Sequence, residues 1–168
     1  MNKITYKNKF FKIFSNDGYF EISPNSRDVM ILPIVDKKSF LLIRSRRKFI
    51  KKNLLEFPAG GFDIKKETPL EGAKREFEEE TGIKVKKKNK IFKIAKFYQM
   101  PNRIRDLVFI YGIYITSDQV NIKYSSEETH SIEVKSFKKT INLIKKNKIK
   151  TSVALAALLN FFISIKKL

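Results

Sequence analysis

The stretch that most constrains the fold is Gly61–Ile83, GFDIKKETPLEGAKREFEEETGI. It contains a helix start, since Thr68 can cap a helix, Pro69 suits the first helical position, and Glu71 completes a capping box. Gly82 marks the end, because the residue after a helix often takes a left-handed backbone that glycine adopts without strain. We therefore predict a helix between these two signals.

Three glutamates of this helix lie within one narrow sector, because Glu76, Glu79 and Glu80 are related by steps of three and four residues. Beside them lies an apolar stripe that can seat the helix on a core, formed by Leu70, Ala73 and Phe77. Like charges at this spacing repel and weaken an isolated helix. One interpretation is an acidic face in solvent. We favour a bound divalent cation, because acid is concentrated here in a basic chain and carboxylate oxygens suit Mg²⁺.

The order of residues also resembles a known motif. Gly61 is followed after five residues by Glu67, and after seven more by Arg75–Ile83, REFEEETGI. This pattern resembles the complete Nudix box. The preceding segment 55–61, LEFPAGG, is similar to the E-x-P-A-G approach of ADP-ribose and nucleoside-diphosphate-sugar pyrophosphatases, a branch of the Nudix family. The resemblance runs from about Asp28 to the C-terminus and implies the Nudix fold, an α/β/α sandwich with a mixed central sheet.

The resemblance also implies what the box does. It predicts an enzyme, a Nudix pyrophosphohydrolase, with Mg²⁺ as its cofactor and Mn²⁺ as a possible substitute. The implied metal ligands are Glu76, Glu79, Glu80 and the backbone carbonyl of Ala59. Glu79 and Glu80 are expected to take part in catalysis. Arg75 is expected to do so by orienting the carboxylates, and Glu67 is expected to brace the loop.

The box does not supply the general base in every member of the family. In the sugar-nucleotide branch an acidic residue from a later loop serves, and Glu127-Glu128 is the matching position here. We predict Glu128 as the base. Glu127 and His130, the one histidine of the chain, are the alternatives.

Substrate-binding residues follow from the same resemblance. The segment around Arg47 resembles the part of the sugar-nucleotide branch that places an arginine against substrate, and Arg44 is the second choice. For either arginine the alternative is a basic strand end in solvent. Glu56 and Pro101 complete the predicted set, although Asn102 stands where related pyrophosphatases carry a glycine.

The implied reaction is Mg²⁺-dependent hydrolysis of nucleoside diphosphates linked to another moiety, with ADP-ribose or a related nucleotide sugar giving AMP and a sugar phosphate. One alternative is a Nudix enzyme that acts on nucleoside triphosphates or RNA 5′ ends. Another is a non-catalytic RNA-binding Nudix module, for which lost box carboxylates would be expected. All box carboxylates are present.

Composition limits the remaining possibilities. The chain has 168 residues, enough for one domain with its own core, and no cysteine, which excludes disulfides and thiolate metal sites. The net charge of +19 favours anionic partners, and nucleic acid is possible but not favoured, since compositional bias is the preferred explanation of the charge. The N-terminal segment shows no pattern that predicts a secretory signal, and the longest apolar run, Val153–Ile163, is too short to cross a bilayer. We expect a cytoplasmic protein without membrane association.

Two segments are predicted along the chain. Residues 1–27 are expected to form a small β-hairpin extension, with strands 3–14 and 19–23 around Asn16-Asp17-Gly18, and residues 28–168 the Nudix hydrolase domain. Strands are predicted at 29–36, 40–44, 91–98, 107–115 and 131–137, and further helices at 138–147 and 152–165. An isolated two-stranded ribbon is marginal in water. The resemblance therefore suggests a homodimer in which the aromatic N-terminal segment helps to form the nucleotide pocket.

Overall fold

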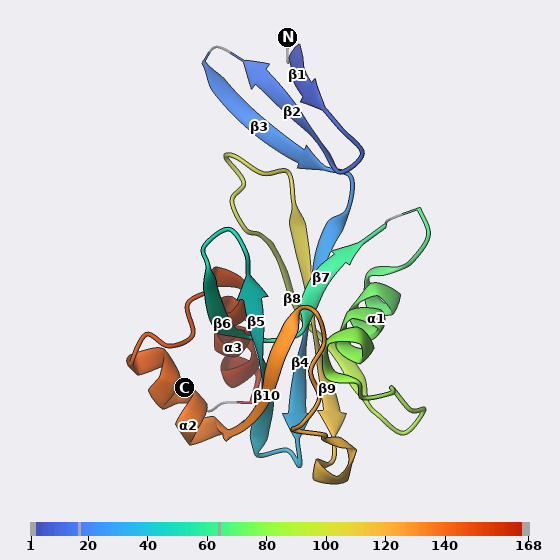
Figure 1. Cartoon of the computed structure of the whole chain (residues 1–168), viewed down its shortest axis with the longest axis vertical. Coiled ribbons are helices and arrows are strands. Elements are labelled where there is room, and N and C mark those ends of the chain that lie inside the picture. The colour runs from blue at the N-terminus through green and yellow to red at the C-terminus, as the bar shows by residue number, and fades with distance from the viewer. Residues whose placement is uncertain (1–2, 17, 64, 166–168) are drawn as a thin grey trace.

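The protein folds as a mixed β-sheet between helices, with a second, small sheet at the N-terminal end (Figure 1). The structure is a computed structural model and describes residues 3–16, 18–63 and 65–165. Its strands are β1 (Lys3–Lys7), β2 (Phe11–Asn16), β3 (Tyr19–Pro24), β4 (Arg27–Val35), β5 (Ser39–Arg47), β6 (Lys52–Glu56), β7 (Ala59–Phe62), β8 (Ile91–Tyr98), β9 (Leu107–Ile115) and β10 (Thr129–Ser136). Its helices are α1 (Pro69–Thr81), α2 (Phe137–Lys145) and α3 (Ser152–Ser164), with a short 3₁₀ turn, η1 (Ser117–Gln119).

The small sheet has three antiparallel strands in the order β1-β2-β3, so the prediction of one strand over residues 3–14 was wrong. The chain turns back at Asn8, whose side-chain oxygen accepts hydrogen bonds from the backbone N–H groups of Phe10 and Phe11, each at 2.8 Å. Asparagine commonly stabilises a turn in this way. The second turn lies between β2 and β3 as predicted, and Asp17 within it lies outside the described residues.

The large sheet has the order β10-β5-β4-β9-β8, with β6 added to β5 and β7 added to β4. Strands β4 and β9 run parallel and the other pairs are antiparallel, which confirms the predicted mixed sheet. The mostly apolar β9 lies between β4 and β8, as expected for a central strand.

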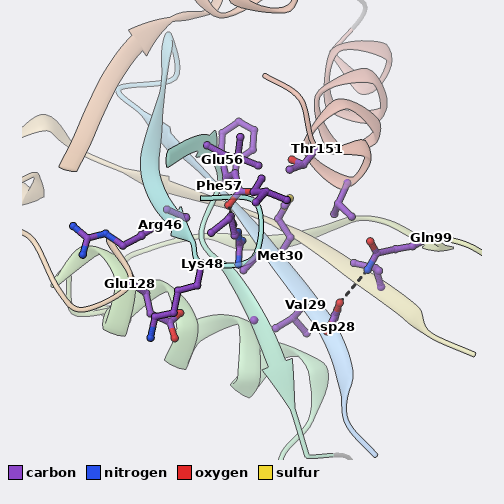
Figure 2. A pocket seen from close by; sticks show the side chains of 18 of the residues that line it. Asp28, Val29, Met30, Arg46, Lys48, Glu56, Phe57, Gln99, Glu128 and Thr151 are labelled. Atoms are coloured by element: carbon purple, nitrogen blue, oxygen red, sulfur yellow. Dashed lines mark hydrogen bonds and ion pairs between the residues drawn. The ribbon is translucent and has the colours of Figure 1, made fainter. Parts of the chain in front are cut away.

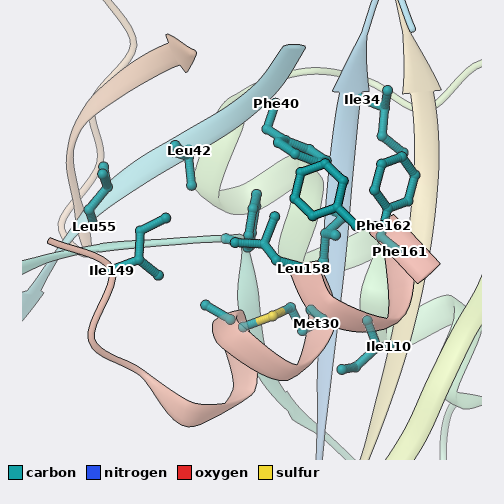
Figure 3. Close-up of a cluster of buried hydrophobic side chains, with 14 of the residues drawn as sticks. Met30, Ile34, Phe40, Leu42, Leu55, Ile110, Ile149, Leu158, Phe161 and Phe162 are labelled. Carbon is teal, nitrogen blue, oxygen red and sulfur yellow. The ribbon is translucent and has the colours of Figure 1, made fainter. Parts of the chain in front are cut away.

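Helices cover both faces of this sheet, as the sandwich requires (Figure 1). Alternate residues of β4 face opposite sides: Val29 packs in the cluster that contains Phe77 of α1, and Met30 packs in the cluster that contains Leu158 and Phe161 of α3. Figure 3 shows the second cluster, where the rings of Phe161 and Phe162 lie over the strands. Large aromatic side chains of this kind stabilise a core strongly, and truncating one costs about 3–5 kcal/mol.

Helix α1 begins and ends where the sequence predicts. The backbone N–H of Thr68 donates to the Glu71 carboxylate at 2.8 Å and the Glu71 N–H donates to the Thr68 hydroxyl at 3.3 Å, which completes the capping box. At the other end Gly82 has a φ of 69°, and its N–H donates to the Glu78 carbonyl at 2.9 Å. Both ends of α1 are therefore determined by hydrogen bonds between residues that are close in the sequence.

Helix α3 is buried on one side only. The buried residues are Ala154, Ala157, Leu158, Phe161 and Phe162. Leu155, Leu159 and Ile163 are exposed at a spacing of four residues and form an apolar stripe on the surface. None of the helices in the described part of the chain is long and apolar enough to span a lipid bilayer.

The small sheet is fixed to the body through the loop that follows β8. The backbone N–H of Ile22 in β3 donates to the Arg103 carbonyl at 2.7 Å, and the N–H of Arg105 donates back to the Ile22 carbonyl at 2.8 Å. The guanidinium of Arg103 also lies over the rings of Tyr19 and Phe20. The position of this loop is thus coupled to the small sheet.

Candidate active site

Two adjoining cavities lie where β4, β5 and β7 meet the start of α3 and the loop before β10. The smaller has a volume of about 390 Å³ and the larger about 700 Å³. They share three lining residues, Gly60, Glu127 and Glu128. A ligand that spans both must therefore pass Gly60.

The smaller cavity gathers carboxylates. Its walls come from α1, from the glycines of β7, and from the loop before β10, and its acidic residues are Glu76, Glu79, Glu80, Glu127 and Glu128. A Cβ atom at position 60 would overlap the Glu76 carboxylate, so this close approach requires the glycine. Gly60 and the segment Glu76–Glu80 of α1 therefore form one wall of the smaller cavity.

Arg75 holds this wall in place. Its guanidinium donates to the carboxylates of Glu76 at 2.7 Å and Glu79 at 3.0 Å. It also donates to Glu67 at 2.9 Å and to the backbone carbonyl of Gly61 at 2.8 Å. One side chain therefore connects two glutamates of α1 with the loop that precedes the helix. These are contacts that an orienting residue would make.

Glu80 is the most buried of the acidic residues in the smaller cavity. Its carboxylate accepts a hydrogen bond from the Ala59 N–H at 2.8 Å. Burial raises the pKa of Glu80 to about 8, and the charges of Glu76 and Glu128 act in the same direction, against the effect of the Ala59 hydrogen bond. Burial likewise raises the pKa of Glu76. The site contains negative charge that the protein only partly compensates.

A hard divalent cation fits this donor set. Among the described residues no three acidic or histidine side chains form a ready-made ligand cluster, and Arg75 bonds to two of the glutamates. The groups that face the cavity are nevertheless carboxylate oxygens, which Mg²⁺ and Mn²⁺ prefer. The close approach of the Glu76 carboxylate to Gly60 and the raised pKa of Glu80 both indicate a place where added positive charge would be stabilised.

The loop before β10 brings two further glutamates to the border between the cavities. The backbone N–H of Arg46 donates to the Glu128 carbonyl at 3.1 Å, which holds the loop against β5. Glu127 forms an exposed ion pair with Lys48 at 3.6 Å, a contact of little energetic weight. His130 is exposed and lines neither cavity, whereas Glu127 and Glu128 line both.

The larger cavity is basic on one side. Arg46, Arg47 and Lys48 line it from the end of β5, and Figure 2 shows Arg46 and Lys48 beside Glu128. Arg47 donates twice to one oxygen of buried Glu56, at 2.6 and 3.0 Å. The predicted residues Arg47 and Glu56 are thus brought together in the wall of the cavity, and the ion pair fixes the guanidinium.

Another side of the larger cavity is formed by Asp28 and Gln99 (Figure 2). The Gln99 amide donates to Asp28 at 3.0 Å and to buried Asp106 at 3.1 Å. Burial raises the pKa of Asp28 to about 6, with the neighbouring Asp106 charge as the second cause. Asp28 directly precedes the apolar run of β4, and no local sequence pattern marked it as a residue of the cavity.

Two predicted substrate residues lie elsewhere. Arg44 forms an ion pair with Glu133 of β10 at 2.5 Å and does not line either cavity. Pro101 is exposed in the loop after β8 and is likewise outside both linings. Ser45 and Thr151 do line the larger cavity, and nothing in their local sequence indicated it.

Comparison with known proteins gives three findings. The family model described as the NUDIX domain matches residues 24–153. An ADP-ribose pyrophosphatase from Bacillus subtilis (strain 168) is 33% identical over 91 residues, which are 54% of this chain and 47% of the relative, so the match spans about half of that protein's length. A crystal structure titled as that of an ADP compounds hydrolase superposes with a TM-score of 0.71 at 19% identity, covering 99% of this chain and 94% of that one, a likeness of fold.

Proposed function

Because the chain belongs to the Nudix family and is a Nudix hydrolase, we propose that it hydrolyses the pyrophosphate bond of nucleoside diphosphates linked to a second moiety. ADP-ribose is the proposed substrate, and AMP and ribose 5-phosphate are the proposed products. The B. subtilis relative bears the name ADP-ribose pyrophosphatase, which supports this choice of substrate.

The observation on which the proposal depends is the junction at Gly60. On one side lie the carboxylates of α1, and on the other lies a cavity of about 700 Å³ with basic residues at its border. A diphosphate at this junction has cation-binding oxygens on one side and Arg46, Arg47 and Lys48 on the other. The larger cavity has room for the organic part of a nucleotide.

In this proposal Glu76, Glu79, Glu80 and the backbone carbonyl of Ala59 hold Mg²⁺. When bound, the cation would polarise the phosphoryl oxygens and lower the pKa of a water molecule. Arg75 keeps the carboxylates in position through its hydrogen bonds to Glu76 and Glu79.

Glu128 is the proposed general base, because it lines both cavities and faces the charges of Glu76 and Glu80. It accepts a proton from the attacking water as the new P–O bond forms and the bridging P–O bond breaks. The leaving phosphate departs with the bridging oxygen. Glu127, which shares the same loop, is the alternative.

A second candidate function is hydrolysis at a nucleoside triphosphate or an RNA 5′ end. The segment that joins β5 to β6 favours it, because Lys48 lines the larger cavity and Lys51 and Lys52 follow closely in the sequence, in a chain of net charge +19. A non-catalytic RNA-binding role is less well supported, since the carboxylates of the box are present and held in position.

The experiment that separates these functions is a substrate screen with Mg²⁺. ADP-ribose, other sugar nucleotides, dinucleoside polyphosphates, nucleoside triphosphates and 5′-triphosphate RNA are compared by kcat/KM. We expect ADP-ribose to rank first, with AMP as a product. A higher kcat/KM for RNA ends or triphosphates would favour the second function, and no turnover of any substrate would favour the binding module.

We further propose that residues 1–27 act as an extension of the Nudix domain and mediate a homodimer. The small sheet exposes several large apolar side chains, Ile4, Tyr6, Phe10, Tyr19 and Phe20. Clusters of exposed apolar residues on one segment are typical of interaction surfaces. Of the described residues in the small sheet, none lines the larger cavity, so any contribution of this sheet to a nucleotide pocket would come from the second copy.

A further inference from the structure

Tyr124 connects two parts of the candidate active site that are far apart in the sequence. Its hydroxyl donates a hydrogen bond to the backbone carbonyl of Glu79 at 2.6 Å, across a separation of 45 residues. Glu79 lies on α1 beside the other carboxylates of the smaller cavity, and Tyr124 lies in the loop before β10 that carries Glu127 and Glu128. This one bond therefore joins the acidic helix to the loop with the proposed general base.

The end of α1 makes this carbonyl available. The last four carbonyls of a helix lack a donor within the helix, and other groups have to serve them. The N–H of Ile83, which would reach the Glu79 carbonyl if the helix continued, donates instead to the Thr81 hydroxyl at 3.2 Å. The Tyr124 hydroxyl takes the place of this helical donor.

The ring of Tyr124 is seated on the glycine that ends the helix. A Cβ atom at position 82 would lie 2.5 Å from the nearest ring atom of Tyr124, which is an overlap. Gly82 also has a φ of 69°, so both its backbone and the ring disfavour a side chain there. The ring packs against the apolar cluster that contains Phe77 and Ile83. These contacts fix the direction in which the hydroxyl points.

The loop is short between this anchor and its two glutamates. Only Ser125 separates Tyr124 from a tight turn, in which the Ser126 N–H donates to the Thr129 carbonyl at 2.9 Å and the Thr129 N–H donates to the Ser126 hydroxyl at 3.0 Å. The two glutamates are the residues enclosed by this turn. The turn is thus held on one side by Tyr124 and on the other by the backbone bond between the loop and β5.

We propose that Tyr124 is a positioning residue of the hydrolytic centre, which holds Glu128 in place relative to the carboxylates of α1. The inference rests on the proposed function for the roles of Glu128 and Glu79. It adds that a residue outside both cavity linings controls the rate of the chemical step, through the loop and without contact with the substrate.

The first test is the variant Tyr124→Phe, which keeps the ring on Gly82 and removes the hydroxyl. Because one hydrogen bond has a modest net worth, we expect kcat for ADP-ribose to fall about 3- to 10-fold and KM to change less than about 2-fold. In a Glu128→Gln background the same substitution should cost less than about 2-fold, because the group that it positions is already lost. Steady-state kinetics of the wild type, both single variants and the double variant measure this coupling.

The second test needs no substrate. Hydrogen exchange in residues 121–129 of the full chain is followed by mass spectrometry in the presence of chelator. Tyr124→Phe should make this segment exchange about 3- to 10-fold faster, because the loop has lost one of its anchors.

Tyr111→Phe is the matched control for both tests. It removes a phenol hydroxyl from a ring that packs against the same apolar cluster, and Tyr111 likewise lies outside both cavity linings. This variant should match the wild type in kcat, in KM and in the exchange of residues 121–129.

Several outcomes would overturn the positioning role. Unchanged exchange in Tyr124→Phe would do so, as would an unchanged kcat, a loss confined to KM, or a loss in kcat that is as large with Glu128→Gln as without it. Equal effects of Tyr111→Phe would also count against it. A wild type that does not hydrolyse ADP-ribose, with faster loop exchange in Tyr124→Phe, would instead contradict the proposed function and leave Tyr124 as the anchor of the loop.

Discussion

The two cavities differ in how their polar groups are satisfied. In the smaller one Arg75 bonds to two of the acidic side chains and Glu80 accepts from the Ala59 N–H. In the larger one, Ser45 and Thr151 keep buried hydroxyls that have no partner within the described chain. The first site is held in position by the protein's own hydrogen bonds, whereas the wall of the second contains polar groups that the protein leaves unsatisfied. We infer that the smaller cavity governs the rate of the chemical step and the larger one governs affinity and choice of substrate.

The largest effect should come from the carboxylates of the smaller cavity. Glu79→Gln or Glu80→Gln removes a carboxylate that we propose binds the cation, and should lower kcat by a factor of about 10³ or more. The fold should remain intact, because Glu80→Gln also removes a buried, repelled charge. Steady-state kinetics with saturating Mg²⁺ measures the loss. Near wild-type turnover in both variants would remove the smaller cavity from the chemistry.

The second largest effect on kcat is expected for Glu128→Gln. The loss of general-base assistance is expected to lower kcat by roughly 10²–10⁴, with little change in metal affinity. Glu127→Gln and His130→Ala serve as comparisons and should do less, and His130 least, because it is exposed and outside both cavities. If His130→Ala proved the most damaging of the three, the assignment of the base to Glu128 would be wrong.

The origin of each cavity explains what the sequence could predict. The smaller one is built mostly from the contiguous segment 59–80, so the capping box, the glutamate spacing and the glycines were visible in order along the chain. The larger one draws on β4, β5, β9 and α3, and the presence of Ser45 and Thr151 in one lining depends on tertiary packing that no local pattern encodes. The predicted Arg47 and Glu56 line it because they lie on paired strands next to the box.

The N-terminal extension shows a different limit. The aromatic content and the turn between β2 and β3 were recognisable in the sequence. The number of strands in the small sheet, however, depends on one asparagine, Asn8. Asn8 accepts two backbone hydrogen bonds and turns a stretch of alternating residues into two strands. The position of Arg44 outside both cavities depends on strand pairing, because β10 lies beside β5 and its Glu133 forms an ion pair with Arg44.

The acidic side of the larger cavity can be tested by measuring how the stability of the protein depends on pH. The pKa of Asp28 is raised to about 6 from 3.8, so between these values the folded chain binds more protons than the unfolded chain and its stability falls as pH rises. Asp28→Asn should abolish this fall. The variant should gain about 1–2 kcal/mol at pH 7, allowing for partial exposure, and nothing below pH of about 4.

Urea unfolding in chelator at pH 4 and pH 7 measures this difference. Asp118→Asn is the control, because hydrogen bonding to Thr116 lowers the pKa of that exposed carboxylate and the substitution should bring no gain at pH 7. If the Asp28→Asn variant were less stable than the wild type at pH 7, the prediction would be wrong, because the Asp28 carboxylate would then stabilise the fold.

The smallest effect on catalysis is expected at the proposed dimer surface. Replacing Tyr19 and Phe20 by serine should shift the protein from dimer to monomer in light scattering, because both rings are exposed and apolar. The kcat for ADP-ribose should change little, since the cavity linings formed by one chain contain neither residue. The KM should rise, because the second copy would no longer contribute to the nucleotide pocket. Leu159→Ser on the exposed stripe of α3 is the control. Dissociation in that variant alone would place the interface on α3, and a monomeric wild type would contradict the homodimer.

The central claim is that a metal-dependent hydrolytic centre and a nucleotide cavity meet at Gly60. It is tested most directly by separating the products formed from ADP-ribose with Mg²⁺, in the wild type and in Glu80→Gln, with and without chelator. We predict AMP and ribose 5-phosphate in equal amounts from the wild type with Mg²⁺ only, and none above background from Glu80→Gln. Cleavage that continues in chelator, or that persists unchanged in Glu80→Gln, would contradict the claim.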